Sequence, residues 1–131
     1  MTYIFDSDVL IAIFGNNPRA LQTLQELRRT GIGVSIVSYA EVFEGAFGYP
    51  DTDSQLTSYR QFLSQFAMFP LSDPIAEIFA SVRSDLRRVG NLIPDLDLLI
   101  AATALHHDVT LVTRNLRHFD RIAGLRTYRP Y

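Results

Sequence analysis

The sequence predicts an α/β protein with a mostly parallel central sheet flanked by helices. Three short apolar segments rich in β-prone residues, 3–5, 32–37 and 109–113, are separated by longer segments with helical periodicity. Strands that alternate with helices favour crossover connections, and hence parallel pairing. A chain of 131 residues with 47% hydrophobic content is expected to form one domain, residues 1–131.

The remaining elements follow from local signals between these strands. Asn17–Pro18 and Asp73–Pro74 are typical helix starts, and Ser38 with Glu41 has the spacing of a capping box. The run 98–105 is apolar nearly all round and predicts a buried helix. The expected helices are residues 9–14, 18 to about 30, 38–47, 53–67, 73–89 and 95–105, with further short strands at 69–71 and 126–128.

Composition excludes several classes of protein. The formal net charge is −2, so a nucleic acid would have to be bound by a local basic patch, and all twelve basic residues are arginine. The absence of cysteine excludes disulfides and thiolate metal sites. No apolar run reaches the roughly 18 residues that a membrane span needs, and no leader is evident, so we expect a cytoplasmic protein without membrane contact.

Carboxylates occur at three places where a predicted helix begins. Asp6 and Asp8 follow the first strand, Glu41 follows the second, and Asp95 and Asp97 begin the buried helix. In a parallel sheet the strand ends share one edge, where ligand sites commonly lie. Carboxylates that close together are stabilised by a cation, and oxygen ligands favour Mg²⁺, with Mn²⁺ as a substitute. Such a metal next to arginines suggests phosphodiester hydrolysis.

Each of these acids except Asp97 also has a structural alternative. Asp6 or Asp8 could simply cap the following helix, and Glu41 occupies the last position of the capping box. Asp95 follows a proline at a helix start and could interact with the helix dipole. His106–His107 lacks metal-ligand spacing and is expected to end its helix, and we expect His118 on the surface, with substrate contact as the alternative.

Four motifs follow one another along the chain. They are Phe5-Asp6-Ser7-Asp8-Val9-Leu10-Ile11, Ala40-Glu41 with Gly45-Ala46, Asp97-Leu98-Leu99-Ile100-Ala101-Ala102-Thr103-Ala104, and Leu111-Val112-Thr113-Arg114-Asn115 with His118-Phe119. In this order the motifs resemble those of PIN-domain ribonucleases, and among them the VapC toxins of VapBC toxin–antitoxin modules. The resemblance spans nearly the whole chain, and residues 97–104 are its most specific part.

The resemblance implies a PIN-like α/β fold and Mg²⁺-dependent endoribonuclease activity. Asp6, Glu41 and Asp97 match the three principal acids of the family, and these residues are expected to bind the metal, Glu41 directly or through water. The fourth acidic position falls near Asn115, where many members carry aspartate. Asn115 is therefore a further catalytic candidate, acting as a ligand through its carbonyl or by positioning water.

Other residues receive secondary roles. The same resemblance makes Asp8, Asp95 and Asp120 possible auxiliary acids. Arg114 and Arg117 lie next to the site in sequence and are candidates to bind RNA phosphates. The expected partners are an RNA substrate, a cognate VapB-like antitoxin and a second copy in a homodimer.

Two rival functions stay open at this point. Asp6-Ser7-Asp8-Val9-Leu10 also resembles the first motif of haloacid-dehalogenase-like phosphatases, although the chain is short and has no lysine for that family's phosphate-binding position. The second rival is a non-catalytic PIN-like binding domain that has lost its fourth acid.

Overall fold

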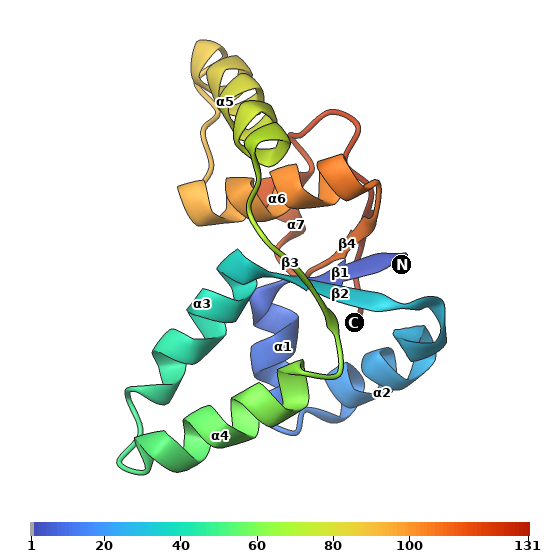
Figure 1. Ribbon diagram of the computed structural model, residues 1–131. Helices are drawn as coiled ribbons and strands as arrows, with labels where there is room; N and C mark the ends of the chain where they lie inside the picture. Colours follow the sequence, from blue (N-terminus) through green and yellow to red (C-terminus); the bar gives the residue numbers. More distant parts are fainter. Residues whose placement is uncertain (1) are drawn as a thin grey trace.

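A parallel sheet forms the centre of the protein, whose computed structural model describes residues 2–131 (Figure 1). Within these residues the sheet has five strands in the order β3-β2-β1-β4-β5, and every pairing is parallel. The predicted α/β class is confirmed. The strands are β1 (Tyr3–Phe5), β2 (Ile32–Ser35), β3 (Ala67–Phe69), β4 (Thr110–Val112) and β5 (Thr127–Tyr128).

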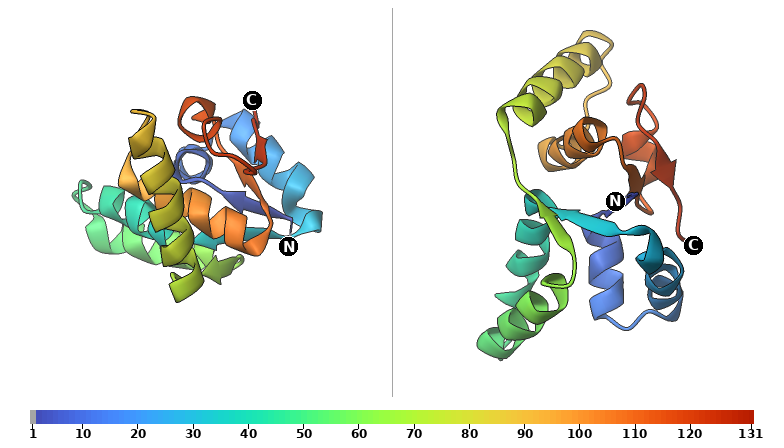
Figure 2. Two further views of the ribbon diagram at one scale, coloured as in Figure 1. Left: turned by 90° about the horizontal axis from the view of Figure 1, so that it is seen from above. Right: turned by 45° about the vertical axis from the view of Figure 1, so that its right-hand side comes forward.

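Helices cover both faces of the sheet (Figures 1 and 2). Those formed by residues 7–63 lie on one face, and those formed by residues 73–119 lie on the other. None of the helices within residues 2–131 has the length and apolar composition needed to cross a bilayer. The helices are α1 (Ser7–Phe14), α2 (Pro18–Leu27), the 3₁₀ turn η1 (Arg28–Thr30), α3 (Ile36–Ala46), α4 (Thr52–Leu63), α5 (Asp73–Arg88), α6 (Asp95–His107) and α7 (Leu116–Phe119).

Two apolar cores lie on either side of the sheet because neighbouring strand residues point to opposite faces. Phe5 and Val112 pack with the helices of the first half of the chain. Ile4 and Leu111 pack with α6, whose residues 98 and 100–104 are buried as predicted. The central strands are therefore fixed from both faces, and the position of the residues that follow them is fixed with them.

The start of α3 differs from the prediction in a way that matters for the site. The strand ends at Ser35, whose hydroxyl oxygen accepts a hydrogen bond from the Ser38 N–H at 2.9 Å, so Ser35 caps the helix. The predicted capping box between Ser38 and Glu41 was therefore wrong. Glu41 lies in the second turn of α3 and has no capping role.

Smaller boundary differences have similar causes. The predicted strand 69–71 begins two residues earlier, because Ala67, Met68 and Phe69 pair with residues 33–35 of β2. The predicted helix 53–67 correspondingly ends at Leu63.

Gly33 in β2 has a packing reason to lack a side chain. A Cβ at this position would lie within 3.0 Å of three ring atoms of Phe69, whose ring also stacks on His107 at 4.1 Å.

We expect Gly33→Ala to lower the free energy of unfolding by about 2 kcal/mol, because overpacked cores must distort. The measurement is urea denaturation. Gly45→Ala is the matched control, because among residues 2–131 no atom beyond its chain neighbours and the adjacent backbone of α3 lies within 4 Å of the added Cβ. Equal stability of the two variants would contradict this account.

Candidate active site

Asp6 is a buried acid held between two strand ends. It follows β1 directly, and its own N–H donates to the Val112 carbonyl at 3.0 Å, which continues the pairing of β1 with β4. One carboxylate oxygen accepts a hydrogen bond from the Ser7 N–H at 2.8 Å and the other accepts one from the Thr113 hydroxyl at 2.7 Å. The side chain does cap α1, but it is only 3% exposed, which a helix cap does not require.

Two further acids near Asp6 each contain an oxygen that lacks a partner. Asp8, in the first turn of α1, accepts a hydrogen bond from the Arg114 N–H at 3.0 Å through one oxygen. Its other oxygen, and one oxygen of Glu41, are buried without a hydrogen-bond partner among residues 2–131. Buried carboxylate oxygens without partners are costly. Their free lone pairs make both carboxylates available as ligands for a cation.

The acids influence each other's protonation. Burial, and then the charge of Asp8, raise the pKa of Asp6 from 3.8 to about 7, against the hydrogen bonds from Thr113 and Ser7. Burial also raises the pKa of Asp8, and burial together with the charge of Asp97 raises the pKa of Glu41. The Asp97 charge contributes to the raised pKa of all three. Asp6, which follows β1, and the acids from α1, α3 and α6 therefore form one electrostatic unit.

Asp97, in the first turn of α6, is held by a histidine. The Nδ1 atom of His118 lies 2.6 Å from one Asp97 carboxylate oxygen and 2.7 Å from the side-chain nitrogen of Asn115. Placing His118 on the surface was wrong, since its side chain is 29% exposed and contacts an acid of the site. The available signal was its position three residues after Asn115, which puts the two side chains on one turn. His106 and His107 end α6 as predicted.

The acid cluster fits a hard divalent cation chemically. Its donors are carboxylate oxygens, one amide and a hydroxyl, the set that Mg²⁺ and Mn²⁺ prefer. The partnerless oxygens of Asp8 and Glu41 are unused donors. Within residues 2–131 no three acidic or histidine side chains already converge as a coordination sphere. The cluster thus contains suitable ligand atoms, but they are not yet arranged as a complete coordination sphere.

A family model provides the decisive comparison. The model of the PIN domain matches residues 3–125 of this chain. The chain belongs to the PIN domain family. The family inferred from the motifs is thus confirmed.

Relatives of this PIN domain have nearly the same length. Ribonuclease VapC2 of Haemophilus influenzae is 27% identical over 127 residues, which cover 97% of this chain and 96% of the relative. The tRNA(fMet)-specific endonuclease VapC of Shigella flexneri is 25% identical, with the same coverage. The crystal structure of VapBC2 from Rickettsia felis bound to a DNA fragment from its promoter matches with a TM-score of 0.89, 26% identity and 98% coverage of each chain.

Two candidate acids of the PIN domain lie apart from the cluster. Asp95 forms an exposed ion pair with Arg83 at 2.9 Å, and Asp120 is exposed at the end of α7. Arg114 is exposed beside Asp8, with its guanidinium 4.6 Å from the centre of the Tyr131 ring. The structure therefore brings the arginine to the acids and leaves Asp95 and Asp120 outside them.

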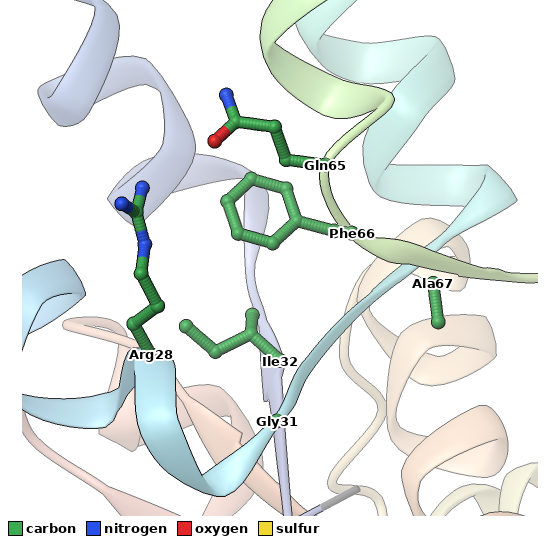
Figure 3. Close-up of a pocket in the computed structure, with 6 residues that line it drawn as sticks. All are labelled: Arg28, Gly31, Ile32, Gln65, Phe66 and Ala67. Atoms are coloured by element: carbon green, nitrogen blue, oxygen red, sulfur yellow. The ribbon is translucent and has the colours of Figure 1, made fainter.

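A pocket of about 440 Å³ lies at the opposite edge of the sheet, where β2 and β3 begin (Figure 3). None of its described lining residues carries a carboxylate, so it is separate from the acid cluster. It is lined by Arg28, Gly31, Ile32, Gln65, Phe66 and Ala67. A second hollow of about 500 Å³ adjoins the cluster, because Glu41 forms part of its wall together with exposed apolar residues such as Leu71 and Leu96.

Proposed function

We propose that this PIN domain is a Mg²⁺-dependent endoribonuclease that acts as the toxin of a type II toxin–antitoxin pair. The observation that carries the proposal is the buried Asp6 beside the partnerless oxygens of Asp8 and Glu41, at the edge where parallel strands end. The names of the VapC relatives support the same activity.

The acids divide the work of hydrolysis between them. Asp6 and Asp97 would hold the cation, with Glu41 as a direct or water-mediated ligand. When bound, the cation would lower the pKa of a water molecule that it holds and would neutralise charge on the phosphoryl oxygens. Thr113 and the Ser7 N–H fix both oxygens of Asp6, so its orientation is set before substrate arrives. A carboxylate of the cluster accepts the proton of the attacking water, which approaches the RNA phosphorus in line with the leaving oxygen.

RNA would be held by the arginines that follow β4. Arg114 and Arg117 are both exposed, and the Arg114 backbone is anchored to Asp8. A guanidinium donates two parallel hydrogen bonds to a phosphate, and the Tyr131 ring beneath Arg114 limits its freedom. This local pair supplies the positive charge that the overall charge of −2 does not.

The same proposal covers partners and location. A VapB-like antitoxin and a second copy of the chain are the proposed protein partners, and the cytoplasm is the proposed compartment. The VapBC complex from Rickettsia felis supports the antitoxin. The apolar hollow beside Glu41 supports protein binding next to the site, because exposed Ile36, Leu71 and Leu96 gain by being covered.

Incubation of purified, antitoxin-free protein with total cellular RNA tests the function. We expect discrete fragments with Mg²⁺ or Mn²⁺ and intact RNA with EDTA, because the acids alone cannot activate water. Turnover of p-nitrophenyl phosphate without RNA cleavage would favour the phosphatase instead. Metal binding by folded protein without either reaction would favour a binding domain.

A further inference from the structure

A continuous series of contacts connects the two acids proposed to hold the cation. The Thr113 hydroxyl donates to Asp6, and the Asn115 N–H donates to the Thr113 oxygen at 3.0 Å. The Asn115 side chain contacts His118 at 2.7 Å, and His118 contacts Asp97 at 2.6 Å. Residues 113–118 thus join the end of β1 to the start of α6.

We propose that His118 is a positioning residue that holds Asp97 in the orientation in which it binds the divalent cation. The proposal rests on the proposed function, because it concerns the same metal site. The contact of His118 engages one oxygen of Asp97 and leaves the other available to the cation. Carboxylates that bind metals are commonly oriented by such outer hydrogen bonds.

Nδ1 of His118 must donate the hydrogen bond that it forms with Asp97. An imidazole nitrogen carries either one proton or one lone pair, so Nδ1 cannot donate to Asp97 and accept from Asn115 together. A cation requires the Asp97 carboxylate to be charged, so Nδ1–H donates to it. Asn115 then turns its amide so that the carbonyl oxygen faces the same N–H, an exchange of two atoms of similar size. The neutral imidazole tautomer with its proton on Nδ1 is sufficient.

This arrangement explains how the site works with Asn115 at the fourth acidic position. An amide adds no negative charge to a cluster in which the pKa values of Asp6, Asp8 and Glu41 are already raised. Asn115 instead connects Thr113 with His118, and His118 supplies the donor that Asp97 needs. The orientation of both metal-binding acids then depends on the same short segment.

Metal titration of His118 variants tests the proposal. In an asparagine side chain the N–H lies near the place of Nδ1, whereas in glutamine it lies near the place of Nε2. We therefore expect His118→Ala and His118→Gln to weaken Mg²⁺ or Mn²⁺ binding about tenfold or more by isothermal titration calorimetry, and His118→Asn to stay within about threefold of wild type. His106→Ala, at the exposed end of α6, is the control and should bind like wild type.

Melting temperatures in EDTA separate orientation from stability. The proposal is supported when His118→Ala melts like wild type in EDTA yet needs more Mg²⁺ for half-maximal RNA cleavage. Unchanged metal affinity in His118→Ala would overturn it, as would equal losses in the Ala and Asn variants of stably folded protein. Weaker metal binding in His118→Ala without any RNA cleavage by wild type would support the positioning role and defeat the ribonuclease function.

Discussion

Replacement of Asp6 or Asp97 by asparagine is expected to reduce RNA cleavage about 1,000-fold or more. Each substitution removes a charged oxygen ligand but keeps the size of the side chain, so the cation is lost or displaced while the fold persists. A loss of this size corresponds to about 4 kcal/mol of transition-state stabilisation. The measurement is the initial rate of cleavage of a defined RNA at saturating Mg²⁺.

An acid outside the cluster provides the control for this experiment. Asp85 lies on α5, exposed and paired with Arg88, and its replacement by asparagine should leave the cleavage rate within about twofold of wild type. Full activity of either Asp6→Asn or Asp97→Asn would refute the assignment of these two ligands. Melting temperatures in EDTA verify that each variant is folded.

The second large effect concerns stability in the absence of metal. Because the folded state raises the pKa of Asp6 from 3.8 to about 7, the folded protein binds this proton more tightly than the unfolded chain. The free energy of unfolding should therefore fall as the pH rises from about 4 to 7, and then level off. The raised pKa values of Asp8 and Glu41 add to the same slope.

Asp6→Asn removes the largest part of this pH dependence. In EDTA at pH 8 the variant should be more stable than wild type by up to about 4 kcal/mol, with little difference near pH 4, as urea denaturation would measure. Saturating Mg²⁺ should reverse the order, because the cation binds and stabilises only the folded wild-type site. Asp85→Asn should follow the wild-type pH profile. If the variant were no more stable than wild type at pH 8 in EDTA, burial of the charged Asp6 carboxylate would not destabilise the metal-free protein, and this account would be wrong.

The sequence predicted the edge where the acids gather because that edge follows from strand ends alone. Asp6 comes directly after an apolar strand, and parallel pairing brings that end beside Thr113. The sequence did not predict which serine would cap α3, because Ser35 and Ser38 both precede helix-compatible residues. Pairing of Ser35 with Phe69 in β3 keeps Ser35 in the strand, and this contact depends on residues more than thirty positions away.

For the contact between His118 and Asp97 the sequence offered only the indirect signal of the spacing between Asn115 and His118. The two residues belong to different helices, and their side chains meet only through the turn after β4. In α2, Leu21, Leu24 and Leu27 are spaced along one helical face, yet Leu21 is 40% exposed, since the facing surface covers only part of that face. Local patterns give the face of a helix, while the extent of its burial depends on what packs against it.

The hydrogen bond between Asp6 and Thr113 joins positions 107 residues apart, which has a consequence for the order of events during synthesis. A ribosome adds Asp6 107 residues before it adds Thr113, which follows β4. Until they emerge, Asp6 lacks its hydroxyl donor and Asp97 lacks its histidine. The growing polypeptide therefore carries the acids without the segment that orders them, and the complete constellation arises only after residues 113–118 have been added.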